Sequence, residues 1–278
     1  MIIAALILTG LVGVTGLAIG SFLNVVVYRV PAGMSVVHPR SACPRCGHEI
    51  TARDNVPVLS WLLLRGKCRS CALPISRRYP LVEMASGVFF VLVALWAAPG
   101  IGVASGAADT VAAVLRLAAF LYLAAISISL ALIDLDVNRL PDKIVLPAYA
   151  VGVALLGGAA ALEQDWIALG RMAAGAGILF AVYFTLALIS PRGMGMGDVK
   201  LAGVLGLFLA SLGWGQLAVG AGAAFILGGL FGIALIVSKR AGRKTGIPFG
   251  PWMLAGAWIG IFAGGVIAGN YLALTGLG

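Results

Sequence analysis

Residues 117–136 read LAAFLYLAAISISLALIDLD, in which seventeen uncharged residues precede Asp134 and Asp136. A helix needs about 20 predominantly apolar residues to cross the hydrocarbon core of a bilayer, and this run approaches that length. An ionisable group at membrane depth is costly and is by default a functional hypothesis. The stretch therefore predicts a transmembrane helix that carries a carboxylate to one boundary of the membrane.

The rest of the chain repeats this pattern of long apolar runs. Only 10% of the 278 residues are charged, whereas about 25% are charged in an ordinary soluble domain. The run at 201–238 is too long for one helix, and Gly213-Trp214-Gly215-Gln216 supplies a break. The sequence therefore predicts an all-α polytopic membrane protein with about eight transmembrane helices, the sixth of them short and near 199–212. The further uncharged runs are 1–28, 84–108, 144–162, 172–191, 201–238 and 245–278.

Positive charge is concentrated in one segment. Residues 29–78 hold nine of the 19 Lys and Arg residues against Glu49 and Asp54, so they carry +7 of the formal net charge of +9. Such an excess is typical of cytoplasmic loops, and because no aromatic stacking pattern accompanies it, we expect the lipid bilayer and not a nucleic acid as partner. Counting helices from an inner loop predicts both termini outside, cytoplasmic loops at 30–80, 134–143, 190–199 and 239–247, and outer loops at 99–110, 163–170 and 213–216.

All four cysteines lie in this basic loop, as two CxxC pairs separated by 21 residues: Cys43, Cys46, Cys68 and Cys71. Two such turns can direct four thiolates at one tetrahedral zinc ion. Two disulfides are the alternative, but disulfides are rare in the reducing cytoplasm. Because four cysteine ligands leave no open coordination position, the zinc is expected to be structural. The predicted domains are a first helix at 1–29, a zinc loop at 30–80 and a membrane domain at 81–278.

Four aspartates stand at predicted helix ends: Asp134, Asp136, Asp142 and Asp198. Three have structural explanations, because Asp142 suits a first helical turn, Asp136 can pair with Arg139, and Asp198 can cap a helix. Asp134 has neither a nearby cation nor a helix start. On a helix Asp134 and Asp136 point to nearly opposite sides, so only one of them can face Asp198.

Two carboxylates brought together can share one proton, so that one activates a water while the other protonates a carbonyl. This is aspartyl peptide hydrolysis, and the glycines before Asp198 would let an extended substrate approach the backbone. Other protease chemistries fit poorly. His48-Glu49 is not followed by a histidine at position 52, as a zinc protease motif requires, and both histidines lie in the basic loop and not in a span.

The motifs resemble a known family. Gly195-Met196-Gly197-Asp198 matches the GxGD signature of intramembrane-type aspartyl proteases, and Ile133-Asp134-Leu135-Asp136 resembles the first aspartate motif of the bacterial type IV prepilin peptidases. The resemblance extends nearly from end to end. Its further matching segments are Gly20-Ser21-Phe22-Leu23-Asn24-Val25, the paired CxxC loop, Arg78-Tyr79-Pro80-Leu81-Val82-Glu83, Leu140-Pro141-Asp142 and Ile247-Pro248-Phe249-Gly250-Pro251.

The resemblance implies an endopeptidase that cuts the basic leader from prepilins or pseudopilins after a glycine, at the cytoplasmic face of the bacterial inner membrane. It places the catalytic pair on Asp134 and Asp198. It also implies N-methylation of the new N-terminal residue with S-adenosylmethionine, because the four-cysteine loop belongs to members that methylate. Gly66 matches a glycine that the family associates with methylation, and no cofactor-binding residue is identified.

Two functions from other classes compete with this interpretation. An ion-coupled transporter also uses intramembrane aspartates, but the two halves of the chain do not look like repeats and the aspartates cluster at one face. A non-catalytic scaffold of a pilus or secretion machine is the third possibility. Cleavage of a synthetic prepilin separates all three.

Overall fold

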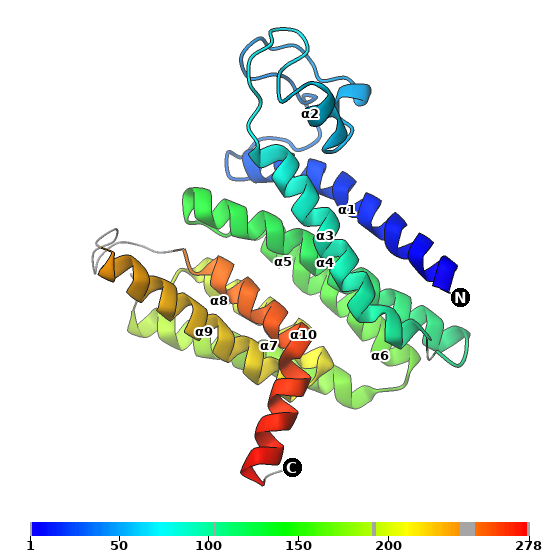
Figure 1. Cartoon of the computed structure of the whole chain (residues 1–278). Coiled ribbons are helices and arrows are strands. Elements are labelled where there is room, and N and C mark those ends of the chain that lie inside the picture. Colours follow the sequence, from blue (N-terminus) through cyan, green and yellow to red (C-terminus); the bar gives the residue numbers. More distant parts are fainter. Residues whose placement is uncertain (1, 103, 191–192, 239–247, 277–278) are drawn as a thin grey trace. The chain divides into compact units, whose positions relative to one another are not determined.

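The computed structural model describes residues 2–102, 104–190, 193–238 and 248–276, with side chains described from residue 7 onward, and these residues form helices joined by short connections and one long loop (Figure 1). The predicted cytoplasmic loop at 239–247, the extreme N-terminus and residues 277–278 lie outside the described residues. The helices are α1 (Ile2–Arg29), η1 (Ala52–Asp54), α2 (Leu59–Leu63), α3 (Arg78–Gly102), α4 (Ala107–Val137), α5 (Asp142–Gly152), η2 (Val153–Gly157), α6 (Gly158–Leu162), α7 (Trp166–Ile189), α8 (Met196–Leu212), α9 (Trp214–Val237) and α10 (Gly250–Thr275).

Among the described residues, seven helical segments are long and apolar enough to cross a membrane. One of them joins α5, the π-helical turn η2 and α6 into a continuous span over Asp142–Leu162. The short sixth helix that the sequence predicts is α8, with 17 residues. The predicted break also occurs, because α8 ends at Leu212 and α9 begins at Trp214, with Gly213 between them at a φ of 154°.

Several helices run further than the uncharged runs suggest. α7 begins at Trp166, so the outer connection predicted at 163–170 is shorter, because the Asp165 carboxylate caps this helix by accepting a hydrogen bond from the Ala168 N–H at 2.9 Å. The predicted loop at 134–143 shrinks to residues 138–141, because α4 continues to Val137 before Asn138 ends it in the left-handed conformation at a φ of 50°.

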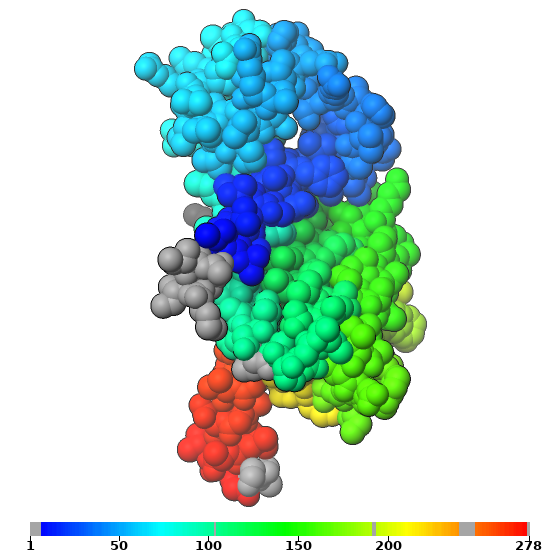
Figure 2. All heavy atoms as spheres, turned by 90° about the vertical axis from the view of Figure 1, so that its right-hand side faces the viewer, coloured from blue at the N-terminus to red at the C-terminus, as the bar shows by residue number. Residues whose placement is uncertain are grey.

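The chain divides into two units, of which the first comprises residues 1–102 and 120–129. In this unit α1 lies against α3 (Figure 1), and Gly16 and Gly20 make the contact. A Cβ on Gly16 would lie 2.8 Å from the Ser86 carbonyl oxygen, and one on Gly20 would lie 2.7 Å from the Glu83 Cα. Glycine is therefore required for this backbone approach. The long loop folds into a packed body beyond the end of α1 (Figure 2).

The second unit comprises residues 103–119 and 130–278 and has α8 at its centre. Every residue of α8 from Leu201 to Ala210 is buried, since α5, α7, α9 and α10 all pack against it. Gly206 permits the close contact with α7, because a Cβ there would lie 2.3 Å from the Gly175 carbonyl oxygen. Gly256 of α10 permits a similar contact with α9, because a Cβ there would lie 2.4 Å from the Ala224 nitrogen.

Ion pairs show which helix ends lie together in this unit. Arg116 of α4 pairs with Glu163, which follows α6. Glu163 begins the outer connection predicted at 163–170, and Arg116 lies six residues beyond the one predicted at 99–110. At the opposite end of α5, the Lys200 ammonium donates to both Asp142 carboxylate oxygens at 2.8 Å. The start of α5 and the start of α8 therefore lie at the same end, as the predicted alternation of inner and outer loops requires.

Candidate active site and candidate metal centre

Asp134 lies in the last turn of α4, and its side chain is buried, with 5% of the residue exposed. The Gly250 N–H, at the start of α10, donates to Asp134 Oδ2 at 3.0 Å. A Cβ on Gly250 would lie 2.8 Å from that oxygen and 3.2 Å from Leu140 Cδ2. The backbone of α10 therefore approaches the carboxylate so closely that only glycine fits without displacing a neighbour.

Asp198 is the third residue of α8 and is half-buried. Its Oδ2 accepts a hydrogen bond from the Gly195 N–H at 3.0 Å, which is the back-bond that an acidic residue makes in the first turn of a helix. The helix-capping role that the sequence allows is therefore present. A Cβ on Gly197 would lie 3.0 Å from Leu140 Cβ, so the chain beside Asp198 packs directly on Leu140.

The two carboxylates come together around Leu140. Gly197, next to Asp198, and Gly250, which binds Asp134, both approach this leucine, and Asp134 and Asp198 are close enough to interact electrostatically. The other two helix-end aspartates differ from this pair. Asp136 is exposed, and Asp142 is exposed and bound to Lys200. The structure therefore brings together the two aspartates that the sequence analysis selects.

An aromatic cluster that the sequence analysis did not predict lies beside the aspartate pair in the second unit. Tyr183 of α7, Phe225 of α9 and Phe249 have ring centroids 5.3–6.2 Å apart. Tyr183 is buried, with 2% exposed, and lies in the vicinity of Asp198. Phe249 directly precedes the glycine that binds Asp134. In the sequence, the Pro248-Phe249-Gly250 segment was the available indication of this cluster. The cluster's geometry depends on three helices that are distant in sequence.

The four cysteines form a second cluster, in the other unit. Their sulfur atoms all lie within 4.8 Å of one another. The Cys43 and Cys71 sulfurs are 3.9 Å apart and the Cys46 and Cys68 sulfurs 4.0 Å apart. A tetrahedral ion with Zn–S bonds of about 2.3 Å has S···S edges of about 3.8 Å, whereas a disulfide measures about 2.05 Å. The cysteines are unbridged, and their spacing fits a metal ion.

Matching backbone turns position the two cysteine pairs. The Cys43 N–H donates to the His48 carbonyl at 3.0 Å, and the Cys68 N–H donates to the Leu73 carbonyl at 2.8 Å. Hydrogen bonds from the backbone N–H groups of Cys46 and Arg45 lower the pKa of the Cys43 thiol to about 6. The thiolate is the form that binds metal, so this turn favours the ligating state.

Gly66 has a structural role in this loop. Its φ of +68° lies in the left-handed region, and a Cβ there would lie 2.8 Å from the Trp61 ring. The Trp61 indole N–H in turn donates to the Ile75 carbonyl at 3.1 Å. Gly66 therefore lets the chain turn tightly over Trp61 just before the second cysteine pair.

Glu83 ties the loop to α3. Its Oε2 accepts a hydrogen bond from the Val58 N–H at 2.7 Å, and Glu83 is only 8% exposed. Val58 has a φ of 61°, which is unusual for a β-branched residue. The buried carboxylate thus holds a strained turn of the loop against the membrane helix.

Comparison with known proteins gives consistent matches over most of the chain. Residues 14–97 match the family profile described as bacterial peptidase A24 N-terminal domain, and residues 121–233 match the type IV leader peptidase family. The chain is 38% identical to a prepilin leader peptidase/N-methyltransferase of Aeromonas hydrophila, over 94% of this chain and 93% of the relative. It is 34% identical to one of Pseudomonas aeruginosa, over 94% and 92% of the two chains. No solved structure matches significantly.

Proposed function

The chain belongs to the type IV leader peptidase family, and from that membership and the geometry of its aspartates we propose that it is a membrane aspartyl endopeptidase and N-methyltransferase acting on prepilins. The observation that carries the proposal is the approach of Asp134 and Asp198 around Leu140. Nothing in the family matches supports the transporter alternative.

In the proposed peptidase reaction the two carboxylates share one proton. One removes a proton from the attacking water while the other donates its proton to the scissile carbonyl oxygen. Each aspartate accepts a backbone N–H, from Gly250 and from Gly195. A hydrogen bond to a carboxylate stabilises its charged form, and a backbone donor also fixes the direction of the side chain. The glycines thus hold both groups in place without occupying the space that the peptide needs.

The substrate would be a prepilin whose apolar N-terminal segment lies among the helices and whose leader is cut after a glycine. The proposed location is the bacterial inner membrane, with both termini outside and the aspartates at the cytoplasmic face. The concentration of Lys and Arg in the cysteine loop supports this orientation.

For the methyl transfer, S-adenosylmethionine supplies an electrophilic methyl group when bound. The new terminal amine would accept this methyl group and would lose a proton to solvent. The proposed role of zinc on Cys43, Cys46, Cys68 and Cys71 is to fold the loop. The sulfur spacing supports this assignment.

The test of the peptidase assignment is cleavage of a synthetic prepilin by purified protein in detergent. We expect Asp134→Asn and Asp198→Asn each to abolish leader removal, because an amide can neither accept the water's proton nor share one with its partner. The matched control is Asp136→Asn, a neighbouring and exposed aspartate, which should cleave at the rate of the unchanged protein. Full cleavage by either of the first two variants would refute the assignment.

A further inference from the structure

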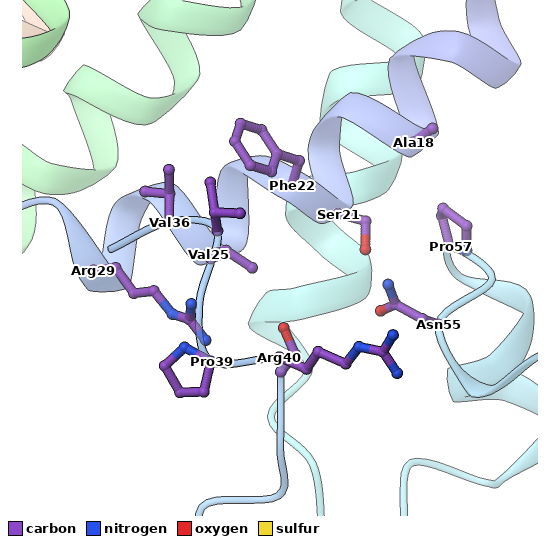
Figure 3. Close-up of a pocket in the computed structure, with 12 residues that line it drawn as sticks. Ala18, Ser21, Phe22, Val25, Arg29, Val36, Pro39, Arg40, Asn55 and Pro57 are labelled. Atoms are coloured by element: carbon purple, nitrogen blue, oxygen red, sulfur yellow. The ribbon is translucent and has the colours of Figure 1, made fainter. Parts of the chain in front are cut away.

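A pocket with a volume of about 340 Å³ lies between the end of α1 and the cysteine loop, wholly within the first unit (Figure 3). Pockets of about 300–1,000 Å³ bind drug-sized ligands, a size range that includes a phospholipid headgroup. Figure 3 shows α1 along one wall and the loop segments that carry Arg40 and Asn55 along the other. The pocket therefore lies where a membrane-spanning helix ends and the polar loop begins.

The charge of the pocket is wholly positive. Its lining includes Arg29 and Arg40 and no acidic side chain. Arg29 is only 8% exposed, and its Nη1 donates to the Ser35 carbonyl at 2.9 Å, which uses one of the five N–H donors of the guanidinium group. Within the described part of the chain, neither arginine forms an ion pair. Because a buried charge is costly unless it is paired, an anionic ligand is the partner that the burial of Arg29 requires.

The α1 wall of the pocket continues along the helix as an apolar face. Ala18 and Phe22 line the pocket, and the exposed residues Leu11 and Val14 precede them. Steps of three and four residues separate these positions, so all four lie on one side of α1. The glycines that contact α3 lie on the opposite side. A headgroup in the pocket would therefore have a continuous apolar surface beside it for an acyl chain.

We propose that this pocket binds an anionic phospholipid, with its phosphate at Arg29, Arg40 at the rim and an acyl chain along the exposed face of α1. Guanidinium groups bind phosphate through charge-assisted, often bidentate hydrogen bonds. Basic pockets beside membrane helices are typical sites for anionic headgroups. A zwitterionic lipid presents the same phosphate, but its ammonium would be repelled by the positive lining.

The apolar lining favours a lipid over a free phosphate ion. A hydrated ion gains nothing from Phe22 or from the face of α1 that continues beyond it, whereas an acyl chain buries apolar surface there. A bound headgroup would also contact both α1 and the loop, and so would hold the start of the loop at the membrane surface. The inference is independent of the proposed enzymatic functions, because the pocket lining includes neither the aspartate pair nor the four cysteines.

The test is native mass spectrometry of the full-length, zinc-loaded protein in detergent, titrated with dioleoyl phosphatidylglycerol or with dioleoyl phosphatidylcholine. We expect one phosphatidylglycerol to bind about tenfold more tightly than phosphatidylcholine, the usual effect of one charge-assisted hydrogen bond. Arg29→Gln should abolish this preference and Arg40→Gln, at an exposed position, should reduce it about threefold, with zinc content unchanged. The matched control is Arg53→Gln, which removes the same charge from an exposed loop residue outside the pocket lining and should keep the preference.

Excess sodium phosphate, compared with sodium chloride at equal ionic strength, distinguishes a lipid site from a site for small anions. We expect phosphatidylglycerol to stay bound in both salts, and its displacement by phosphate alone would overturn the lipid assignment. Equal binding of the two lipids, or an equal loss of preference in Arg53→Gln, would show diffuse attraction to the basic loop and would also overturn it. Should Arg29→Gln lose zinc, Arg40→Gln is decisive, and an unchanged preference in that variant overturns the inference.

Discussion

The cysteine loop and the aspartate pair each hold reactive side chains at a defined spacing, but by opposite means. The loop collects four sulfurs from a segment of 29 residues, positions 43–71, and most of its large apolar residues remain exposed. The aspartates come from α4 and α8 and depend on a helix buried along ten consecutive residues. Four cysteines spaced for a metal ion therefore hold the candidate site in one region, whereas apolar packing positions the site in the other.

The largest expected effect follows from removing the metal. Structural zinc contributes roughly 10–16 kcal/mol to folding of small zinc domains, and little buried apolar surface would replace it here. Chelation, or Cys46→Ser, should raise amide hydrogen exchange throughout residues 34–76 and leave exchange in α7 and α8 unchanged. Mass-spectrometric exchange measures both regions together. Equal protection of the loop with and without metal would show that packing suffices there.

The next largest effect is expected on catalysis, from a substitution that changes no charged residue. Gly250→Ala places a Cβ 2.8 Å from Asp134 Oδ2, so the carboxylate has to move. A misplacement of about 1 Å can reduce a rate about 100-fold, and we expect a loss of that order in kcat for leader cleavage with zinc content unchanged. Gly269→Ala is the control, since nothing lies within 4 Å of its Cβ.

A smaller effect should reach the aspartates through helix packing. Gly206→Ala puts a Cβ 2.3 Å from the Gly175 carbonyl oxygen and forces α7 and α8 apart. Overpacking of this kind typically costs about 1–3 kcal/mol, so thermal unfolding in detergent should begin at a lower temperature. Gly222→Ala in α9, where the added Cβ meets open space, should leave the transition unchanged. An unaltered unfolding transition in the Gly206 variant would mean that α7 and α8 can move apart at this contact without loss of stability.

The smallest effect is expected at the exposed ion pair of the loop. Arg69 donates to both Asp54 oxygens at 2.6 and 2.7 Å and lowers the pKa of that carboxyl. Because the folded-state pKa is depressed, the stabilisation is present at neutral pH and is lost as pH falls through it. Arg69→Gln should speed proteolysis of the loop slightly at low salt and not at high salt, because screening weakens exposed pairs. A difference that persists at high salt would indicate lost packing.

The predictions that depend on short-range pattern agree with the structure. The two CxxC turns come together as expected, because each turn is closed by its own backbone hydrogen bonds. The break at Gly213 and the short helix before it also occur. The helix boundaries that the uncharged runs predict were less accurate. Side-chain caps such as Asp165 extend a helix beyond its apolar run, and hydropathy does not record them.

Glu83 and Tyr183 make contacts that short-range sequence patterns do not predict. The carboxylate of Glu83 accepts a hydrogen bond from a backbone N–H 25 residues away. Tyr183 looks like one more aromatic residue of an apolar helix, although its ring packs against Phe225 and against Phe249, the neighbour of the glycine that binds Asp134. In both cases the partner is selected by a neighbouring helix or loop, and no local pattern encodes that choice.

Residue type and spacing alone thus predict a multi-span α-helical membrane protein, a four-cysteine cluster in a basic loop, and Asp134 as the carboxylate least explained by structure, whereas the GxGD resemblance adds Asp198. These properties follow from hydropathy, charge and the reach of a short turn. Helix packing added the Gly250 donor to Asp134, 116 residues away in the chain, and the pocket between α1 and the loop. Gly250 can donate only because the backbone of α10 approaches Asp134 closely, and that approach is determined only once the helices are packed together.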